Sequence, residues 1–379
     1  MYLDHAAATP VDPVVLDEMM PYFLDKFYNP SSPYAPAVKV RQEYIAAKAR
    51  IGRCLGVHGD ELVMTAGATE SVNIGLSAVG DGVAAVGATE HASVLQAATK
   101  SGGIIIPADK KGRVTPEALA RALRPDVSVI SVGLVNNELG TIQPIDEIVK
   151  VVQVERARRR EAGETRPLYV HCDASQALAL LDIKPKRMGI DLLTLSAAKV
   201  YGPKQVGLLW IRPGVVVRPT IVGGGQEMGL RSGTENVAGV VGFAVAAELA
   251  AKRRSGEVKR LRNLRDAMQR ELEQTFPDMI VSSDKKKGLA NFLHVSFPGV
   301  DAERLIFKLE ARDVMVATGS ACAANKGTQS HVLKAIGMSD EAIQGSLRIS
   351  LGRLSNEENC KEATRLVIEA VRAEYARIS

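Results

Sequence analysis

The sequence predicts an α/β fold with a mostly parallel, doubly wound sheet, on the strength of three observations. Short apolar runs typical of buried strands alternate with helical patterns along much of the chain. Polar residues follow several of these runs, at the strand ends where such sheets bind ligands. The length of 379 residues suffices for a large domain and a smaller one. We expect the large domain over residues 14–255, and a small domain formed by residues 256–379 together with 1–13.

The expected elements alternate in chain order. Residues 1–13 hold too many small side chains for a helix core, and helical spacing begins near Pro13. Further helices are expected over residues 38–55, 145–160, 237–251, 258–272 and 302–309. Strands are expected over residues 61–65, 83–87, 103–107, 127–135, 168–172, 192–195, 207–211 and 293–297. The boundary between the domains is placed between the helices that end near residue 251 and begin near residue 258.

Composition excludes several classes of function. The hydrophobic fraction of 46% is ordinary for a globular enzyme, and the net charge of +5 is mild. The dense basic run at residues 156–160 is interrupted by acids, so it predicts a solvated helix end and no nucleic-acid surface. No charged-then-apolar leader opens the chain, and no apolar stretch approaches bilayer length. We therefore expect a cytoplasmic protein that contacts neither membrane nor nucleic acid.

The cysteines lie far apart, at positions 54, 172, 322 and 360, without a CxxC pair. This spacing argues against a disulfide framework and against a zinc site, so no metal is expected. Cys54, Cys172 and Cys360 fall in strand or helix contexts that are typical of buried, inert thiols. Cys322 lies in a small, polar, glycine-containing loop, where a buried thiol and a mobile thiolate that reaches a ligand both remain open.

A lysine stands at the end of a predicted strand. The apolar run 192–195 leads through Ser196 and two alanines to Lys199 and then to a Gly-Pro turn. Such a lysine can form a Schiff base with a carbonyl compound if burial lowers its pKa, whereas a surface lysine in a loop would do nothing of the kind. The polar residues at such strand ends are His91, Asn137, Asp173, Gln176, Ser196 and Lys199.

Three further segments carry candidate ligand-binding groups. Residues 61–71 read as strand, glycine turn and helix start, which is either an anion site or a plain helix cap. The glycine-rich segment 221–236 lacks the spacing of a phosphate-binding loop, so it either approaches a phosphate or forms a turn. Arg348 lies within a strand-like run and needs an anionic partner, which is either a substrate carboxylate or a structural acid.

Together these segments resemble the NifS-like cysteine desulfurases of the class V aminotransferase family. The similarity runs nearly end to end and includes YLDHAA (2–7), NPSS (29–32), TAGATE (65–70), EH (90–91), NNELGT (136–141), DASQ (173–176), RSGTEN (231–236), GSAC (319–322) and RISLGR (348–353). The resemblance implies the fold-type I pyridoxal-phosphate fold, with a seven-stranded sheet in the large domain and a smaller α+β C-terminal domain. The stretch from Cys322 to Ser330 is similar to that of the long-loop group.

The resemblance also implies roles for the polar residues around pyridoxal 5'-phosphate. Lys199 would hold the cofactor as a Schiff base and move the substrate Cα proton. Asp173 would pair with the pyridine nitrogen, which keeps the ring an electron sink. Gln176 would bond the ring hydroxyl, and His91 would stack on the ring and help to transfer protons. The implied cofactor-binding residues are Ala68, Thr69, His91, Asn137, Asp173, Gln176, Ser196 and Lys199, with Thr234 supplied by the partner subunit of a homodimer.

The substrate and the product follow from the same resemblance. Asn137 and Arg348 would bind the carboxylate of L-cysteine, to which the planar arginine fork is suited. Cys322 would attack the substrate sulfur, which leaves L-alanine and a persulfide on Cys322. The persulfide would pass to a sulfur acceptor, such as an iron-sulfur scaffold protein or the machinery of tRNA thiolation.

The chain departs from the family pattern at four places: Ala198 stands where a histidine is usual, Met228 where a basic residue is usual, Tyr34 for histidine and Gln205 for glycine. Losing one hydrogen bond to the phosphate would cost about 1–3 kcal/mol of cofactor binding. We therefore expect a working enzyme that retains its cofactor less firmly. A selenocysteine lyase, another class V enzyme, or a degenerate scaffold for sulfur-transfer partners remain alternatives; an aminotransferase would not need Cys322.

Overall fold

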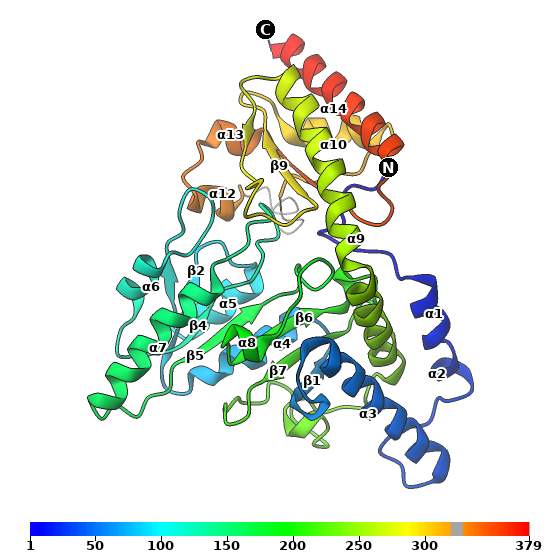
Figure 1. Ribbon diagram of the computed structural model, residues 1–379, viewed down its shortest axis with the longest axis vertical. Helices are drawn as coiled ribbons and strands as arrows, with labels where there is room; N and C mark the ends of the chain where they lie inside the picture. The colour runs from blue at the N-terminus through cyan, green and yellow to red at the C-terminus, as the bar shows by residue number, and fades with distance from the viewer. Residues whose placement is uncertain (320–328, 379) are drawn as a thin grey trace.

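A seven-stranded, mostly parallel sheet forms the centre of the molecule, as predicted (Figure 1). The computed structural model describes residues 1–319 and 329–378. The strand order is β1-β7-β6-β5-β4-β2-β3; β7 pairs antiparallel with both β1 and β6, and the other neighbouring pairs are parallel. The strands are β1 (Leu62–Thr65), β2 (Val83–Gly87), β3 (Ile104–Ile106), β4 (Val127–Ser131), β5 (Tyr169–Asp173), β6 (Leu192–Ser196) and β7 (Gly207–Ile211).

Helices cover both faces of this sheet because successive strand residues point to opposite sides. Leu62 and Met64 belong to the larger core, which includes side chains of α3, α7 and α9, whereas Val63 belongs to a smaller core beneath α4 and α5. The helices of this part are α1 (Pro13–Met19), α2 (Pro21–Leu24), α3 (Ala35–Leu55), α4 (Ala68–Leu76), α5 (Ala92–Lys100), α6 (Pro116–Ala122), α7 (Ile145–Glu161), α8 (Pro185–Met188), α9 (Val237–Thr275) and the short 3-10 turns η1 (Gly59–Glu61), η2 (Ser77–Val79), η3 (Ala197–Lys199) and η4 (Glu227–Gly229). No helix in the described ranges has the length and apolar character needed to span a bilayer.

A second, three-stranded sheet lies toward the C-terminal end of the chain, in the order β10-β9-β8 (Figure 1). The N-terminal segment joins it through a single bridge from Asp4 to Ser350, and a second bridge pairs Tyr2 with Met315 beside the sheet. Its elements are β8 (Ile280–Val281), β9 (Phe292–Ser296), β10 (Ser346–Ser350), α10 (Ala302–Glu310), α12 (His331–Ala335), α13 (Asp340–Gln344) and α14 (Glu357–Ile378).

Helix α9 connects the two sheets and differs from the prediction (Figure 1). We expected two helices with a domain boundary near residue 255, but the chain forms one continuous helix of 39 residues. Residues 251–256 are largely exposed, and Gly256 costs a helix interior only about 1 kcal/mol. The charged stretch therefore does not interrupt the helix, because apolar residues on either side pack against α3 and α14.

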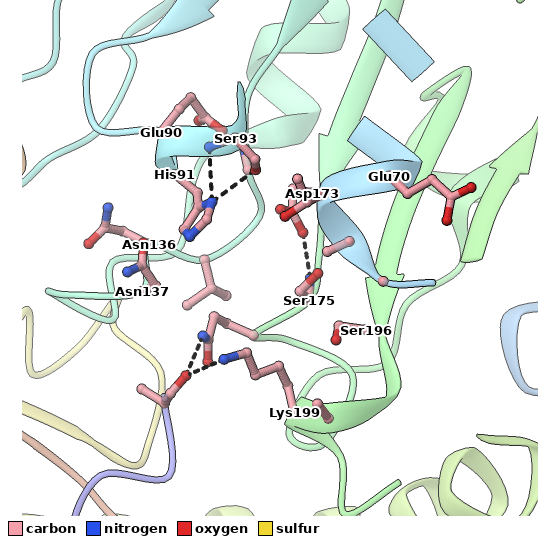
Figure 2. A pocket seen from close by; sticks show the side chains of 18 of the residues that line it. Glu70, Glu90, His91, Ser93, Asn136, Asn137, Asp173, Ser175, Ser196 and Lys199 are labelled. Atoms are coloured by element: carbon pink, nitrogen blue, oxygen red, sulfur yellow. Dashed lines mark hydrogen bonds between the residues drawn. The ribbon is translucent and has the colours of Figure 1, made fainter. Parts of the chain in front are cut away.

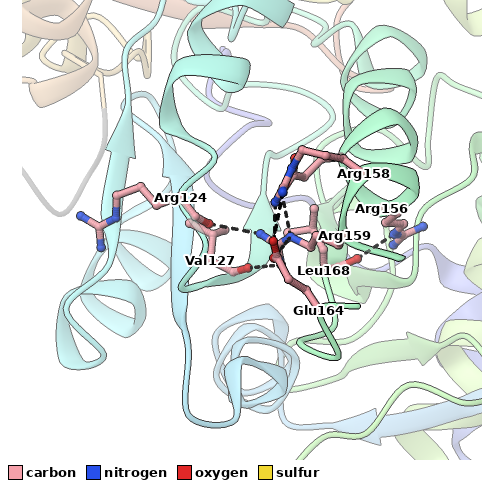
Figure 3. Close-up of polar contacts among 8 residues, drawn as sticks. Arg124, Val127, Arg156, Arg158, Arg159, Glu164 and Leu168 are labelled. Carbon is pink, nitrogen blue, oxygen red and sulfur yellow. Dashed lines mark hydrogen bonds and ion pairs between the residues drawn. The ribbon is translucent and has the colours of Figure 1, made fainter. Parts of the chain in front are cut away.

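The basic run at the end of α7 also differs from the prediction. Arg159 is only 2% exposed, and its guanidinium donates to the backbone oxygens of Val127 (2.9 Å) and Arg124 (3.1 Å) and to Glu155 (2.8 Å) (Figure 3). Arg158 stays half exposed and bonds Glu155 and Glu164. Only part of the run is a solvated helix end, because Arg159 ties α7 to the start of β4.

Candidate active site

A cavity of about 870 Å³ opens at the carboxyl ends of the parallel strands. Its walls come from the segments that follow β1, β2, β4, β5 and β6, with the N-terminal residues Ala6 and Ala7 on one side. The predicted site residues that line it are Ala68, Thr69, His91, Asn137, Asp173, Gln176, Ser196, Lys199 and Arg348. Cys322 lies outside the described residues, and Thr234 is exposed and does not line this cavity.

Lys199 ends the turn η3 directly after β6 and extends into the cavity (Figure 2). Its Nζ donates to the backbone oxygens of Ala6 (2.8 Å) and Ala7 (2.5 Å). The Gln176 amide donates to the same Ala6 oxygen at 3.0 Å. The N-terminal segment therefore holds the amine of Lys199 in the cavity, beside the amide of Gln176.

Asp173 closes β5 and presents its carboxylate to the same space (Figure 2). Its Oδ1 accepts a hydrogen bond from the Ser175 amide at 2.9 Å. Behind it, His171 is fully buried between the hydroxyls of Ser131 (2.8 Å) and Thr194 (2.9 Å). Burial lowers the pKa of His171 to about 4, so this histidine is neutral and adds no positive charge behind Asp173.

His91 begins α5 and faces Asp173 across the cavity (Figure 2). Its Nδ1 accepts from the Ser93 amide at 3.1 Å and lies 2.8 Å from the Ser93 hydroxyl. Because Nδ1 is the acceptor, the ring proton resides on Nε2. Burial lowers the pKa of His91, although the Asp173 carboxylate opposes this shift. A neutral imidazole with a fixed tautomer is therefore available in the cavity.

The start of α4 is suited to an anion. Its N-cap Gly67 has φ 147° and offers no side chain, so the first amide groups of the helix are not capped by it. Glu70 also lines the cavity (Figure 2), and its carboxylate pairs with Arg231 at 3.1 Å. Thr69 and Ser196 contribute hydroxyls to the same end of the cavity. A phosphate fits this donor set.

Arg348 is 2% exposed, on strand β10. Its guanidinium donates to the backbone oxygen of Asn137 at 2.9 Å and to Asp4 at 2.5 Å, and it still borders the cavity. The sequence left the partner open between a substrate carboxylate and a structural acid, and the structure provides the structural acid. The other N–H groups of the Arg348 guanidinium can donate hydrogen bonds to a carboxylate bound in the cavity.

Glu90 is a buried acid on which the sequence interpretation placed no role. Its carboxyl accepts from the Gly133 amide at 2.8 Å. Burial, assisted by the Asp173 carboxylate, raises the pKa of Glu90 to about 8, although the Gly133 hydrogen bond opposes the shift. The Glu90-His91 pair was part of the resemblance, and an acid directly before a cavity histidine was the signal that could have marked it.

Of the four residues that depart from the family pattern, two line the cavity and two lie at the surface. Ala198 and Gln205 both line the cavity, whereas Met228 and Tyr34 are 56% and 50% exposed. The glycine-rich segment 221–236 does not line this cavity. Its Glu227 turns inward to bond Tyr44 at 2.5 Å, so in this chain the segment behaves as an anchored turn.

The known proteins that are similar to this chain point to one group of enzymes. The family model "Aminotransferase class-V" matches residues 1–362. The cysteine desulfurase IscS of Dictyoglomus turgidum is 37% identical over 95% of this chain and 91% of its own length, and IscS 1 of Archaeoglobus fulgidus is 37% identical over 94% and 93%.

Among solved structures, a NifS-like protein superimposes with a TM-score of 0.89 at 31% identity, covering 98% of this chain and 99% of its own. SspA in complex with cysteine superimposes with a TM-score of 0.76 at 32% identity, covering 92% and 98%. With the lysine, aspartate and histidine gathered at one cavity, these matches establish the family. The chain belongs to the aminotransferase class-V family, among its NifS-like cysteine desulfurases.

Proposed function

We propose that this protein is a pyridoxal-phosphate-dependent cysteine desulfurase that converts L-cysteine to L-alanine and a protein-bound persulfide. The observation that carries the proposal is the convergence of Lys199, Asp173 and His91 on one cavity that Arg348 also borders. Relatives named cysteine desulfurase match nearly the whole chain, which supports the same activity. The cavity is large enough for a cofactor and an amino acid together.

The residues present fit the cofactor at both of its polar ends. Asp173 would pair with the pyridine nitrogen, while Thr69, Ser196 and the amides at the start of α4 would hold the phosphate. When bound, pyridoxal phosphate supplies an electron sink for the electron pair released at the substrate Cα. Lys199 holds the cofactor and moves the Cα proton, and Ala6 and Ala7 keep its amine within reach.

The substrate would be oriented by groups from both sheets. Arg348, whose guanidinium is set by Asn137 and Asp4, would receive the L-cysteine carboxylate. His91 would stack on the cofactor ring, and Gln176 would bond its hydroxyl. A neutral His91 with its proton on Nε2 can also donate to a group in the cavity.

We assign the sulfur acceptor within the chain to Cys322. Burial raises the pKa of the other thiols, Cys54, Cys172 and Cys360, which disfavours their thiolate forms. The Cys322 thiolate would attack the substrate sulfur, so that an S–S bond forms as the C–S bond breaks. The carbon then takes up a proton and leaves as L-alanine.

The same proposal extends to the oligomeric state, the cellular location, the sulfur acceptor and the domains. The protein acts as a homodimer in the cytoplasm, and Thr234 reaches the phosphate of the partner subunit. The persulfide passes to a sulfur acceptor such as an iron-sulfur scaffold protein. The exposure of Thr234 supports the dimer, because a hydroxyl outside its own cavity is available to another subunit. The chain divides into a large domain (14–255) and a small domain (256–379 with 1–13), joined by α9.

The visible absorption spectrum before and after addition of L-cysteine tests the function, together with assays of alanine and sulfide. We expect an absorption band that shifts with cysteine, is lost in Lys199→Ala and accompanies alanine release. In Cys322→Ser the band should persist while sulfide release is lost. A protein that cannot take up pyridoxal phosphate would overturn the proposal in favour of a scaffold, and a far higher rate with selenocysteine would indicate a selenocysteine lyase.

A further inference from the structure

The phosphate end of the cavity lacks a donor at position 198. Ala198 presents only a methyl group to the cavity. Its backbone oxygen accepts from the amide and the hydroxyl of Thr9, at 3.1 Å and 3.0 Å. The residue therefore fixes the N-terminal segment and contributes nothing that can bind an anion.

Gln205 lines the same cavity and adopts a costly backbone conformation. Its φ of 58° lies in the left-handed region that favours glycine. Its side chain is exposed and has no hydrogen-bond partner within residues 1–319 and 329–378. Strained backbone that no local contact explains is concentrated at functional sites, so the cause is to be sought in the cavity.

The turn that carries Gln205 is fixed against the start of α4. In the sheet, Ser196 pairs with Gly207, and the Ala197 amide donates to the Val206 oxygen at 3.0 Å. A methyl group added at Gly207 would lie 2.7 Å from the Cα of Gly67, the N-cap of α4. Gln205 therefore stands two residues from the closest contact between β7 and the anion-binding helix start.

The cationic side chains of Lys204 and Arg231 already have partners. The Nζ of Lys204 donates to the Thr9 oxygen at 3.1 Å, and Arg231, which does not line the cavity, pairs with the Glu70 carboxylate. The Gln205 amide carries two N–H donors and no charge. It is thus the side chain of this turn that a phosphate could engage without breaking an existing contact.

We propose that Gln205 is a phosphate-binding residue, whose side-chain amide donates to the cofactor phosphate and replaces the donor that Ala198 cannot supply. The inference rests on the proposed pyridoxal-phosphate site. If Gln205 compensates for the missing donor at Ala198, the protein retains its cofactor as firmly as a protein with a histidine at position 198. The backbone strain at position 205 persists because the phosphate contact requires a side chain there.

The test is a double-mutant cycle on Gln205 and Ala198, read by equilibrium binding. Gln205→Gly should weaken pyridoxal phosphate binding, and inorganic phosphate binding to the cofactor-free protein, by about tenfold or more. The same change should raise the Tm of the cofactor-free protein by about 1 °C, because the strain is relieved. Ala198→His should restore cofactor affinity in the Gln205→Gly background and change it less than about twofold in the wild type.

Asp313 offers a matched control, since it is exposed and has φ 60° far from the cavity residues in sequence. Asp313→Gly should raise the Tm similarly and leave both affinities unchanged. The inference is overturned if Gln205→Gly binds both ligands as tightly as the wild type, or if Ala198→His tightens binding equally in both backgrounds. If the wild type fails to bind pyridoxal phosphate, the proposed function falls, and inorganic phosphate binding still decides whether Gln205 contacts a phosphate.

Discussion

Replacing Glu90 by glutamine should change how the stability of the protein depends on pH. Glu90 is 6% exposed, and its pKa of about 8 in the folded protein compares with an ordinary value of 4.5. A carboxyl whose pKa is higher in the folded state stabilises the fold below its unfolded pKa. That contribution is lost as the pH rises through the folded pKa. Glu90 therefore makes the protein progressively less stable between about pH 4.5 and pH 8.

The size of the effect follows from the two pKa values. Within this window the unfolded state releases a proton that the folded state retains, so the free energy of unfolding falls by about 1.4 kcal/mol per pH unit. From pH 6 to pH 8 the loss is about 2 kcal/mol, and above pH 8 it levels off. Glutamine does not titrate, and its side-chain oxygen can still accept the hydrogen bond from the Gly133 amide.

Urea unfolding of the cofactor-free protein at pH 6, 7, 8 and 9, on both sides of the Glu90 pKa of about 8, measures this difference. The stability advantage of Glu90→Gln over the wild type should grow by about 2 kcal/mol between pH 6 and pH 8 and then level off. Glu358→Gln, on the exposed face of α14, serves as the control. Parallel curves for Glu90→Gln and the wild type would refute a neutral, buried Glu90.

Three other substitutions test separate parts of the argument. Arg348→Lys replaces the planar guanidinium, which can bind a carboxylate through two N–H groups, by a single amine. The KM for L-cysteine should therefore rise about tenfold or more in steady-state kinetics. An unchanged KM would exclude Arg348 from carboxylate binding. Gly207→Ala should lower the free energy of unfolding, measured in urea, by about 1–3 kcal/mol, because the added methyl group clashes with Gly67. Gly256→Ala lies in open space on α9 and should raise the free energy of unfolding by about 0.5–1 kcal/mol. Equal effects of the two substitutions would contradict the close contact at Gly207. Arg159→Met should cost about 2 kcal/mol in urea unfolding, and an unchanged midpoint would mean that the whole basic run is solvated.

Much of the fold could be predicted because its signals are local. Strands β2 and β7 have the predicted bounds, since each is a compact apolar run between polar or glycine-rich turns. Strand β4 ends at Ser131, although the apolar run continues to residue 135. Val132 and Leu134 still donate to backbone oxygens of β5 and pack in the core, whereas Gly133 and Val135 line the cavity. The sequence did not predict one unbroken helix α9, because its continuity depends on the burial of its two ends and not on a local sequence pattern.

In the candidate site, too, local signals were predictable and contacts between distant segments were not. Asp173, His91 and Lys199 could be placed together because each follows a strand, and parallel strands end at one edge of a sheet. Nothing in the spacing of Glu90 reveals that its carboxyl is buried against Gly133, because that contact joins two different strand ends. The strain at Gln205 is likewise invisible in the sequence, where glutamine has no conformational signature.

The N-terminal segment is the part of the site that long-range contacts alone define. Asp4 holds Arg348 across 344 residues of sequence, and three residues later Ala7 accepts from the amine of Lys199. The same segment is bonded to strand β10, where the Ser350 amide donates to the Leu3 oxygen at 2.8 Å. Because β10 carries Arg348 and the lysine turn follows β6, this short segment sets the distance between groups on two different sheets. The predicted small residues of this segment are therefore explained by close passage between the sheets, since larger side chains would occupy the space that the substrate needs.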